Sequence, residues 1–326
     1  MIIAQKNESF VLIGNEPSRL RYPKIVGDIK LYKYDDNHNV IQFEYGKDYC
    51  VEDGCIVRKS DKIPDYRSSP FYNKTPFNHE KMATFGNDPY MMYADYEAEV
   101  DIEDTVDFNA EKIAEENGNR GVLSSFFNRF KKPVMNLLVF GDSISEGGGT
   151  TDLKYAYFSR LKDYIEKNYP FKVNLTNKAI GGESSIDGIR RYKEVITSEY
   201  DLMILAYGMN DQVLDENGNQ YFTPENYYEN LKTMTEYALK NNVETILVSP
   251  CLSNPRWVHS SPILDEFVER VKLLSLELHI PYADIYDLWK RELHYKGHSD
   301  LLQNDINHPS DFGHYIYFTE FKVLIK

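Results

Sequence analysis

The apolar run VMNLLVF at residues 134–140 passes directly into the polar, glycine-rich turn GDSISEGGG at residues 141–149. A run of this length and hydrophobicity is typical of a strand that is buried on both faces of a sheet. Later runs of the same kind lie at 171–176, 201–207, 243–249 and 281–285. Helical patterns are expected between and after them, at about 154–168, 185–197, 224–241, 261–279 and 311–325. Strands that alternate with helices predict an α/β fold, with a parallel sheet covered by helices on both faces.

Upstream of Pro133 the chain has a different character, with short alternating stretches separated by turn residues. Such stretches are typical of an all-β domain of the sandwich or jelly-roll kind. The expected strands are Phe10–Ile13, Ile29–Tyr34, Val40–Tyr45, Cys55–Arg58 and Tyr93–Ile102. We therefore predict a smaller β domain at 1–108, a connector at 109–133 and an α/β domain at 134–326.

Three segments of the N-terminal part allow two interpretations each. Acidic residues occupy every second position from Asp95 to Glu103, which predicts a solvated strand face, with a cation or sugar site as the alternative. The connector is expected to hold a short amphipathic helix docked on the protein, the alternative being a membrane-surface helix. Residues 60–90 hold four prolines and six aromatic residues, which predict an ordered loop held by ring packing, or else a surface for stacking on sugars. These aromatic residues are Tyr66, Phe71, Tyr72, Phe77, Phe85 and Tyr90.

The composition excludes several classes of partner. Acidic residues outnumber basic ones by 51 to 37, and the net charge of −14 argues against a nucleic acid or an anionic membrane as partner. No apolar run approaches the ~20 residues of a membrane span, and the first residues lack the pattern of a secretory signal, so we expect a cytoplasmic protein. The three cysteines are too few for a disulfide framework, and no metal-ligand spacing is present, so neither a metal nor a cofactor is expected. The 26 tyrosines stand against only 2 tryptophans, which raises the question of what the tyrosine rings of the N-terminal half contact.

Residues able to do chemistry gather after the predicted strands, where a parallel sheet forms its ligand site. Ser143 follows the first strand, Gly182 the second and Asn210 the third, and His308 precedes the last helix. A serine hydroxyl is a weak nucleophile until a base takes its proton, and a histidine can do so near neutral pH. Asp305, three residues before His308, can lie on the same turn and accept a hydrogen bond from the other ring nitrogen.

In this order, the four segments resemble the signature blocks of the SGNH (GDSL) hydrolase family, and the resemblance covers about residues 134–326. It implies a flavodoxin-like three-layer α/β/α fold and a serine esterase with Ser143, Asp305 and His308 as its catalytic triad. It also implies an oxyanion hole made of the backbone N–H groups of Ser143 and Gly182 and the side chain of Asn210. We expect glycine at 182 because a close backbone approach leaves no room for a Cβ atom.

The other polar residues near these blocks are interpreted mainly as structural. Asp142 is expected to cap the turn that carries the serine, Asp211 to be structural, and His314 to face away from the site on the last helix. Three residues after the fourth strand could line the cleft as substrate contacts or could pack within their own loop. These are Asn254, Arg256 and Trp257.

An all-β domain ahead of an SGNH domain is similar in architecture to the two-domain carbohydrate esterases, especially carbohydrate esterase family two. That similarity implies removal of acetyl groups from a small-molecule or oligosaccharide ester. Another acyl hydrolase on the same triad, such as a lysophospholipase or thioesterase, is the first alternative, and a non-catalytic carbohydrate-binding protein is the second. The sequence does not indicate an oligomeric state.

Overall fold

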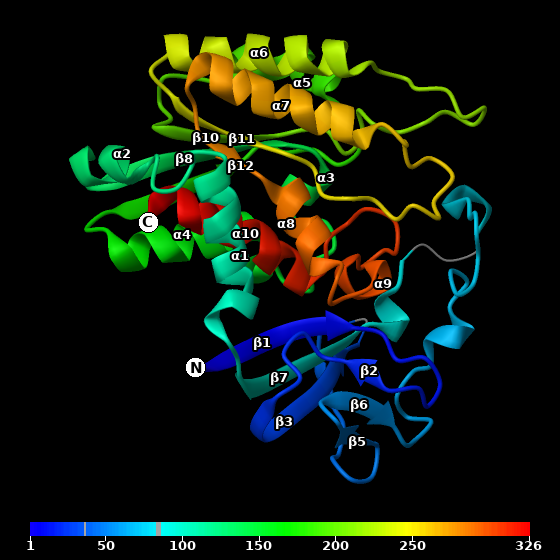
Figure 1. Cartoon of the computed structure of the whole chain (residues 1–326). Coiled ribbons are helices and arrows are strands. Elements are labelled where there is room, and N and C mark those ends of the chain that lie inside the picture. Colours follow the sequence, from blue (N-terminus) through cyan, green and yellow to red (C-terminus); the bar gives the residue numbers. More distant parts are fainter. Residues whose placement is uncertain (36, 83–85) are drawn as a thin grey trace.

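The computed structural model describes residues 1–35, 37–82 and 86–326. Its C-terminal part is built on a five-stranded parallel sheet in the order β12-β11-β10-β8-β9 (Figure 1). The strands are β8 (Val134–Gly141), β9 (Lys172–Asn177), β10 (Leu202–Ala206), β11 (Glu244–Val248) and β12 (Tyr282–Ala283). The predicted α/β fold is therefore confirmed, with a last strand of only two residues.

Helices cover both faces of this sheet because the strands are apolar on both sides. Leu137 and Val139 of β8 pack with α1, α4, α8 and α10, whereas Leu138 and Phe140 pack with α5, α6 and α7. The larger helices are α1 (Val106–Glu116), α4 (Tyr157–Asn168), α5 (Ser185–Val195), α6 (Pro224–Lys240), α7 (Leu264–Leu278), α8 (Ile285–Glu292) and α10 (Asp311–Ile325). The shorter helices are α2 (Ser124–Arg129), α3 (Ser143–Glu146) and α9 (His298–Leu301).

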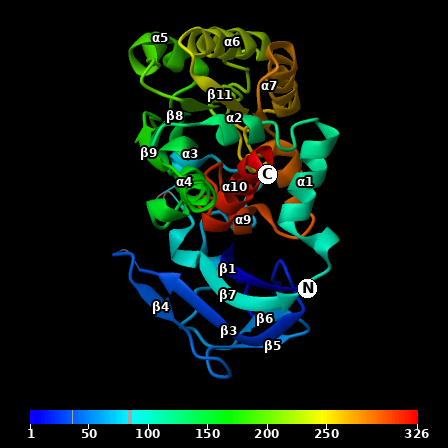
Figure 2. The same ribbon diagram turned by 90° about the vertical axis from the view of Figure 1, so that its left-hand side faces the viewer.

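The N-terminal part is a pair of antiparallel sheets that enclose a core of their own. The larger sheet has the order β1-β7-β3-β4, with β1 (Ile2–Phe10), β3 (Ile25–Tyr34), β4 (Val40–Gln42) and β7 (Met92–Glu99). The smaller sheet has the order β2-β6-β5, with β2 (Ser18–Arg19), β5 (Tyr49–Glu52) and β6 (Cys55–Arg58). An all-β N-terminal region is thus confirmed, and Figure 2 shows it below the α/β layers.

Strand β1 departs from the expected strand at Phe10–Ile13, since it ends at Phe10 and begins at Ile2. The register of β1 against β7 shifts between Gln5 and Glu8, where Asn7 has a left-handed φ of 53°. This bulge breaks the two-residue period, and buried Glu8 and Ser9 place polar groups where a core strand would be apolar. The alternation of apolar and polar residues is therefore lost in β1, because this irregular strand packs against α9 and α10 of the other domain.

The described residues of the aromatic segment 60–90 follow an irregular path with three 3₁₀ turns, η1 (Tyr66–Ser68), η2 (His79–Lys81) and η3 (Asp88–Tyr90). Tyr66, Phe71 and Phe77 are buried, so these rings serve packing. Phe77 and Phe71 pack on Trp257 and Ile306 of the α/β domain. Phe85, which the sequence grouped with these rings, lies outside the described residues.

The predicted acidic face of strand β7 is solvated at one end only. Glu97 and Glu99 are exposed, whereas Asp95 accepts hydrogen bonds from the Asn7 amide and the Tyr32 hydroxyl.

The expected connector forms α1 and α2, and both pack against α10. Among the described residues, no helix combines the length and the apolar character needed to cross a bilayer.

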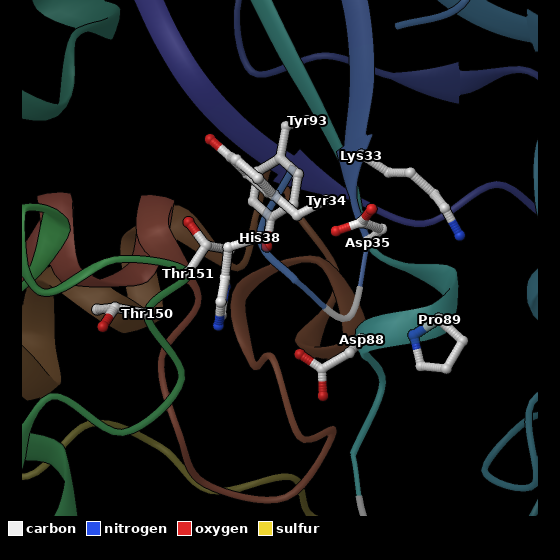
Figure 3. A pocket seen from close by; sticks show the side chains of 9 residues that line it. All are labelled: Lys33, Tyr34, Asp35, His38, Asp88, Pro89, Tyr93, Thr150 and Thr151. Atoms are coloured by element: carbon white, nitrogen blue, oxygen red, sulfur yellow. The ribbon is translucent and has the colours of Figure 1, made fainter. Parts of the chain in front are cut away.

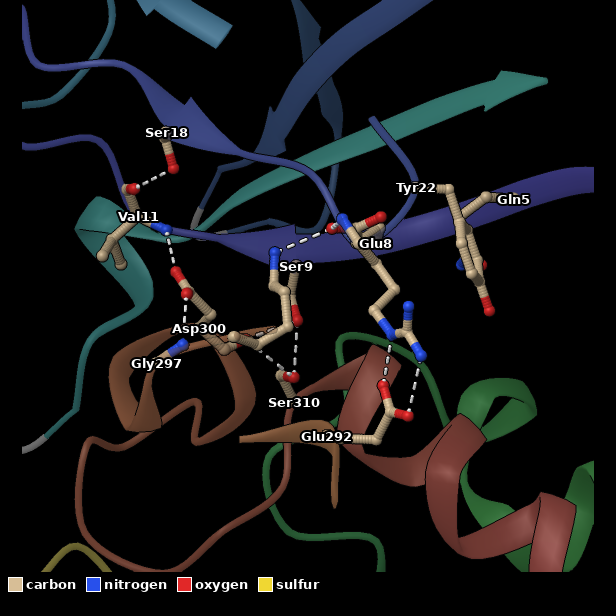
Figure 4. A network of polar contacts seen from close by, with 12 residues as sticks. Gln5, Glu8, Ser9, Val11, Ser18, Tyr22, Glu292, Gly297, Asp300 and Ser310 are labelled. Atoms are coloured by element: carbon tan, nitrogen blue, oxygen red, sulfur yellow. Dashed lines mark hydrogen bonds and ion pairs between the residues drawn. The ribbon is translucent and has the colours of Figure 1, made fainter. Parts of the chain in front are cut away.

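The interface between the N-terminal domain and the α/β domain contains a cavity and a set of buried polar contacts. A cavity of about 520 Å³ lies between the β3–β4 hairpin and residues 150–151 (Figure 3). Elsewhere the domains meet through buried polar groups (Figure 4). Ser9 Oγ lies 2.6 Å from Ser310 Oγ, and the Val11 amide donates to Asp300.

Two buried ion pairs cross this interface, and each domain supplies the basic residue of one pair and the acidic residue of the other. Arg21 of the β domain donates to Glu292 at the end of α8, with Nε–Oε2 at 2.6 Å and Nη2–Oε1 at 3.1 Å. Lys296 of the α/β domain donates to Glu8 of β1, with Nζ–Oε1 at 2.7 Å. All four side chains are at most 1% exposed. Because each of these buried charges is paired with a partner from the other domain, both ion pairs belong to the interface that joins the domains.

Candidate active site

Ser143 lies at the start of α3, directly after β8, and this placement is set by its neighbours. The Asp142 side chain accepts a hydrogen bond from the Ile144 amide at 3.0 Å and caps the helix, as expected. At Gly141 a Cβ atom would lie 2.3 Å from the Ala206 carbonyl oxygen, so only glycine lets β8 and β10 end this close together. The serine is thereby held at the carboxyl edge of the sheet with its side chain partly exposed.

His308 is brought to Ser143 from the turn before α10. Its Nε2 lies 2.9 Å from Ser143 Oγ, which is hydrogen-bond distance between a nucleophile and its base. The turn is fixed by Asn304, whose Oδ1 accepts hydrogen bonds from the backbone amides of residues 306, 307 and 308 at 2.9–3.0 Å. Burial lowers the pKa of His308 to about 4, so the ring is neutral at pH 7 and can accept the serine proton.

Asp305 occupies the expected turn, but its carboxylate is turned to other partners. In the part of the chain that the structure describes, no hydrogen bond joins Asp305 to His308. The Asp305 carboxylate instead accepts from Tyr66 Oη and Ser299 Oγ, both at 2.7 Å, and from Arg256 Nη2 at 3.2 Å. Burial raises the pKa of Asp305, and the hydrogen bonds from Ser299 and Tyr66 and the charge of Arg256 oppose that rise.

The three residues expected at the cleft rim take part in this arrangement. Asn254 is buried and donates to the Asp305 carbonyl oxygen at 2.8 Å. Arg256 pairs with the Asp305 carboxylate, and Trp257 donates from Nε1 to His79 Nδ1 at 3.0 Å. Their observed contacts are therefore with the His308 turn and the aromatic segment, and the substrate contact expected of them stays a prediction.

The glycine segment after β9 lies beside the serine. The Ile180 amide donates to the Gly141 carbonyl at 3.1 Å, and a Cβ built on Gly181 would lie 3.8 Å from Ser143 Cβ. Gly182 has a φ of +81°, but nothing lies within 4 Å of the place where its Cβ would be. Its positive φ disfavours a side chain at this position, and the close approach expected of this glycine stays a prediction.

Asn210 reaches the same segment from the end of β10. Its Nδ2 donates to the Glu183 carbonyl oxygen at 2.8 Å, which leaves its second N–H for another acceptor. The next residue, Asp211, is buried and accepts hydrogen bonds from the Ser185 amide and hydroxyl. Asp211 thus ties the start of α5 to the Asn210 loop, which is the structural role expected of it.

His314 was expected to face away from the site, and the structure corrects this. Its Nε2 donates to the Gly148 carbonyl at 3.1 Å, and its Nδ1 accepts from the Tyr157 amide at 3.4 Å. Full burial lowers the pKa of His314 to about 3, so it stays neutral and supports the glycine loop next to Ser143. The α10 helix carries His314, and the contact of this side chain with Gly148 joins the helix to the glycine loop.

Two residues near the site were not anticipated from the sequence. Tyr66 contacts Asp305 across 239 positions of sequence, and no local pattern could signal this pairing. Asp311 accepts hydrogen bonds from the Thr151 amide and hydroxyl and from Asn7 of the β domain. The only sequence signal at Asp311 is its position at the start of a helix, where an acidic residue is favourable. That signal does not predict the contacts with Thr151 and Asn7.

Comparison with known proteins gives the following similarities. The model of the GDSL-like lipase/acylhydrolase family matches residues 139–316. The fold is similar to a lipase/acylhydrolase from Enterococcus faecalis, with 25% identity over 57% of this chain and 93% of that one and a TM-score of 0.47. It is also similar to Axe2, an acetylxylan esterase from Geobacillus stearothermophilus, with 21% identity over 59% of this chain and 94% of that one and a TM-score of 0.50. A search of the curated proteins finds no match.

Proposed function

Since the chain belongs to the GDSL-like lipase/acylhydrolase family, we propose that it removes short acyl groups, acetyl foremost, from carbohydrate esters. Ser143 is the nucleophile and His308 the base in this proposal. The observation that carries it is the 2.9 Å contact between Ser143 Oγ and His308 Nε2 beside the Gly182 and Asn210 segments.

The reaction follows from this geometry in two steps. In the first, Ser143 Oγ attacks the ester carbonyl while His308 takes the hydroxyl proton. The C–O bond to the alcohol then breaks, and His308 passes that proton to the departing alcohol oxygen. In the second, water attacks the acyl-serine and gives a proton to His308, which returns it to Ser143 Oγ as the carboxylic acid leaves. The sum is ester plus water giving acid plus alcohol.

Both tetrahedral intermediates carry a negative oxygen that needs preorganised donors. We assign this role to the backbone N–H groups of Ser143 and Gly182 and to the Asn210 side chain. Glu183 supports the assignment, because its carbonyl oxygen holds the Asn210 amide against the glycine segment. Asp305 acts in this proposal through the turn that carries His308.

Two observations favour a carbohydrate ester over a lipid ester. The fold resembles that of an acetylxylan esterase, and an all-β domain is docked beside the site through the aromatic segment. Neither fixes the substrate, since one fold supports many activities. An ester panel with acetyl, butyryl and octanoyl groups on nitrophenol and on sugars tests the proposal, and preferred turnover of octanoyl esters would contradict it and favour the lysophospholipase or thioesterase alternative.

The nucleophile is tested separately with a fluorophosphonate probe, which labels an activated serine covalently. Wild-type protein should be labelled, and Ser143→Ala should not. Ser145→Ala is the matched control, because Ser145 lies two residues away and its hydroxyl contacts Tyr157 at 2.8 Å. Labelling that survives in Ser143→Ala would exclude Ser143, and an unlabelled wild-type protein inactive on every ester would indicate a non-catalytic protein.

A further inference from the structure

The side chain of Glu146 lies beside the nucleophile and takes no part in the arrangement described so far. Glu146 is the last residue of α3, three positions after Ser143, and residues at this spacing are neighbours on one side of a helical turn. Gly147 ends the helix with a φ of 111°. Glu146 is exposed and Ser143 is partly exposed, so a substrate that reaches the serine can also reach this carboxylate.

The neighbouring Gly181 shows where the carboxylate lies. A Cβ atom added to Gly181 would lie 2.8 Å from Glu146 Oε2 and 3.8 Å from Ser143 Cβ. The carboxylate of Glu146 thus fills the space that a side chain at position 181 would need, and the serine side chain borders the same space. Gly181 directly precedes Gly182, whose backbone N–H we assign to the oxyanion hole. The nucleophile and the carboxylate therefore meet at one exposed glycine.

The other carboxylates in the four signature blocks already have partners in the protein. Each accepts hydrogen bonds from a backbone amide or from a side chain. They are Asp142, Glu183, Asp211 and Asp305. By contrast, within residues 1–35, 37–82 and 86–326, Glu146 accepts no hydrogen bond at its carboxylate and forms no ion pair. Its two oxygens are therefore available to donors that belong to a substrate.

The chemistry of a carboxylate limits what this donor can be. An ionised carboxylate only accepts hydrogen bonds, so it can bind a hydroxyl group or a cationic ammonium group of a substrate. Proteins recognise quaternary ammonium groups chiefly with aromatic rings, whereas the neighbours Gly147 and Gly181 contribute no ring. A hydroxyl group needs only the acceptor oxygen, so the site favours a hydroxyl over a cation.

We propose that Glu146 accepts a hydrogen bond from a free hydroxyl group of the sugar, next to the ester that Ser143 attacks. In a partly acetylated sugar such a hydroxyl lies only a few bonds from the ester carbonyl, so both groups can be held beside Gly181 at once. The inference rests on the proposed function and adds a specificity to it. Sugars with a free hydroxyl beside the ester are preferred over fully acetylated sugars, which lack this donor.

The test uses three acetate esters: a methyl xyloside with one acetyl group and free neighbouring hydroxyls, the same xyloside with every hydroxyl acetylated, and nitrophenyl acetate. In Glu146→Ala, the ratio of kcat/KM for the monoacetylated xyloside to that for nitrophenyl acetate should fall about tenfold or more, because a hydrogen bond to a charged group is lost. The same ratio for the fully acetylated xyloside should stay close to the wild-type value. Glu146→Gln keeps one acceptor oxygen and should give a smaller fall.

Gly181→Ala tests the position of the carboxylate by a second route. The φ of Gly181 lies outside the left-handed region, so alanine suits its backbone, and the new methyl group would displace the Glu146 carboxylate. The ratio for the monoacetylated xyloside should therefore fall, and the double variant with Glu146→Ala should fall no further than Glu146→Ala alone. Glu199→Gln is the matched control, because it removes the same charge at an exposed position before β10 and should keep the wild-type ratios.

The outcomes separate this contact from the proposed function. If wild-type protein hydrolyses the xylosides but Glu146→Ala keeps the wild-type ratios and melting temperature, the contact is refuted and the esterase function stands. If wild-type protein cleaves nitrophenyl acetate but neither xyloside, the carbohydrate substrate and the contact both fail. An equal fall for the fully acetylated xyloside, or a fall that Glu199→Gln reproduces, would also refute the contact. A larger loss with acetylcholine than with the monoacetylated xyloside would refute it in favour of a cation.

Discussion

Asp305→Asn separates a structural role of this carboxylate from direct assistance to His308. Four side-chain donors surround the carboxylate: Tyr66 and Arg256 bond Oδ2, while Ser299 and Asn254 bond Oδ1. An asparagine keeps one acceptor oxygen and places an NH₂ group in the position of the other. One pair of donors would then face a donor, and Arg256 would lose its counter-charge.

The size of the effect follows from these contacts. Losing a charge-assisted hydrogen bond costs about 1.5–3 kcal/mol, and an unsatisfied buried donor costs about 1–3 kcal/mol more. Arg256 is partly exposed, which weakens its share, so we expect about 3 kcal/mol of lost stability. For 326 residues the unfolding entropy is about 0.7 kcal/mol/K, so the melting temperature should fall by about 4 °C.

The effect on turnover should be much smaller than in an enzyme whose acid holds the histidine. Losing an acid that fixes the tautomer of a catalytic histidine lowers kcat by about 10⁴. Because Asp305 makes no hydrogen bond to His308 within the described residues, we expect a loss of about tenfold or less, caused by loosening of the turn. Tyr66→Phe is the matched control: it removes one donor, so stability should fall by about 1 kcal/mol with nearly unchanged kcat.

Thermal unfolding and nitrophenyl acetate kinetics at pH 7 measure both effects on the same samples. A melting temperature close to the wild type together with a 10⁴-fold loss in kcat would refute the reasoning. That result would mean that the carboxylate contacts the imidazole in the working enzyme and that the contacts with Tyr66 and Arg256 contribute little.

Three further predictions concern the oxyanion hole, the base and the domain interface. Asn210→Ala should lower kcat by about 10²–10³ with little change in stability, and an unchanged kcat would exclude Asn210 from the oxyanion hole. Because burial lowers the pKa of His308 to about 4, the base stays neutral as the pH falls. The acidic limb of the kcat/KM profile should therefore have its midpoint well below pH 6.5, and a midpoint at pH 6.5 would contradict this prediction. Glu292→Gln leaves the buried charge of Arg21 without a partner and should cost about 3–5 kcal/mol in a denaturant titration, whereas Glu116→Gln, at an exposed pair, should cost about 1 kcal/mol or less.

The α/β domain could be predicted because its elements carry their own signals. Buried strands such as β8 are apolar on both faces, and the helices between them show a regular period. The β domain was harder, since β1 buries Glu8 and Ser9 against the other domain and bulges at Asn7. A polar strand that is buried by a partner domain cannot be distinguished from a loop by its hydrophobic pattern.

The candidate site shows the same division between local and long-range signals. Ser143, Gly182, Asn210 and His308 could be found because each follows a strand or precedes a helix in a recognisable block. The partners of Asp305 could not, because Tyr66 comes from the aromatic segment of the other domain. Spacing along the chain places Asp305 and His308 on one turn, but it does not decide which way the carboxylate points.

The tyrosine excess is explained in part by this interface. Tyr32, Tyr66 and Tyr96 pack their rings in the N-terminal half, while their hydroxyls reach Asn7, Asp305 and Glu8 respectively. Phenylalanine would fill the same space but would remove one donor from each of these polar groups, and tryptophan would place its single N–H differently. Tyrosine is therefore suited to a domain whose core borders a polar interface with another domain. Because this interface includes the turn that carries His308, the β domain supports the candidate active site through the contact of Tyr66 with Asp305.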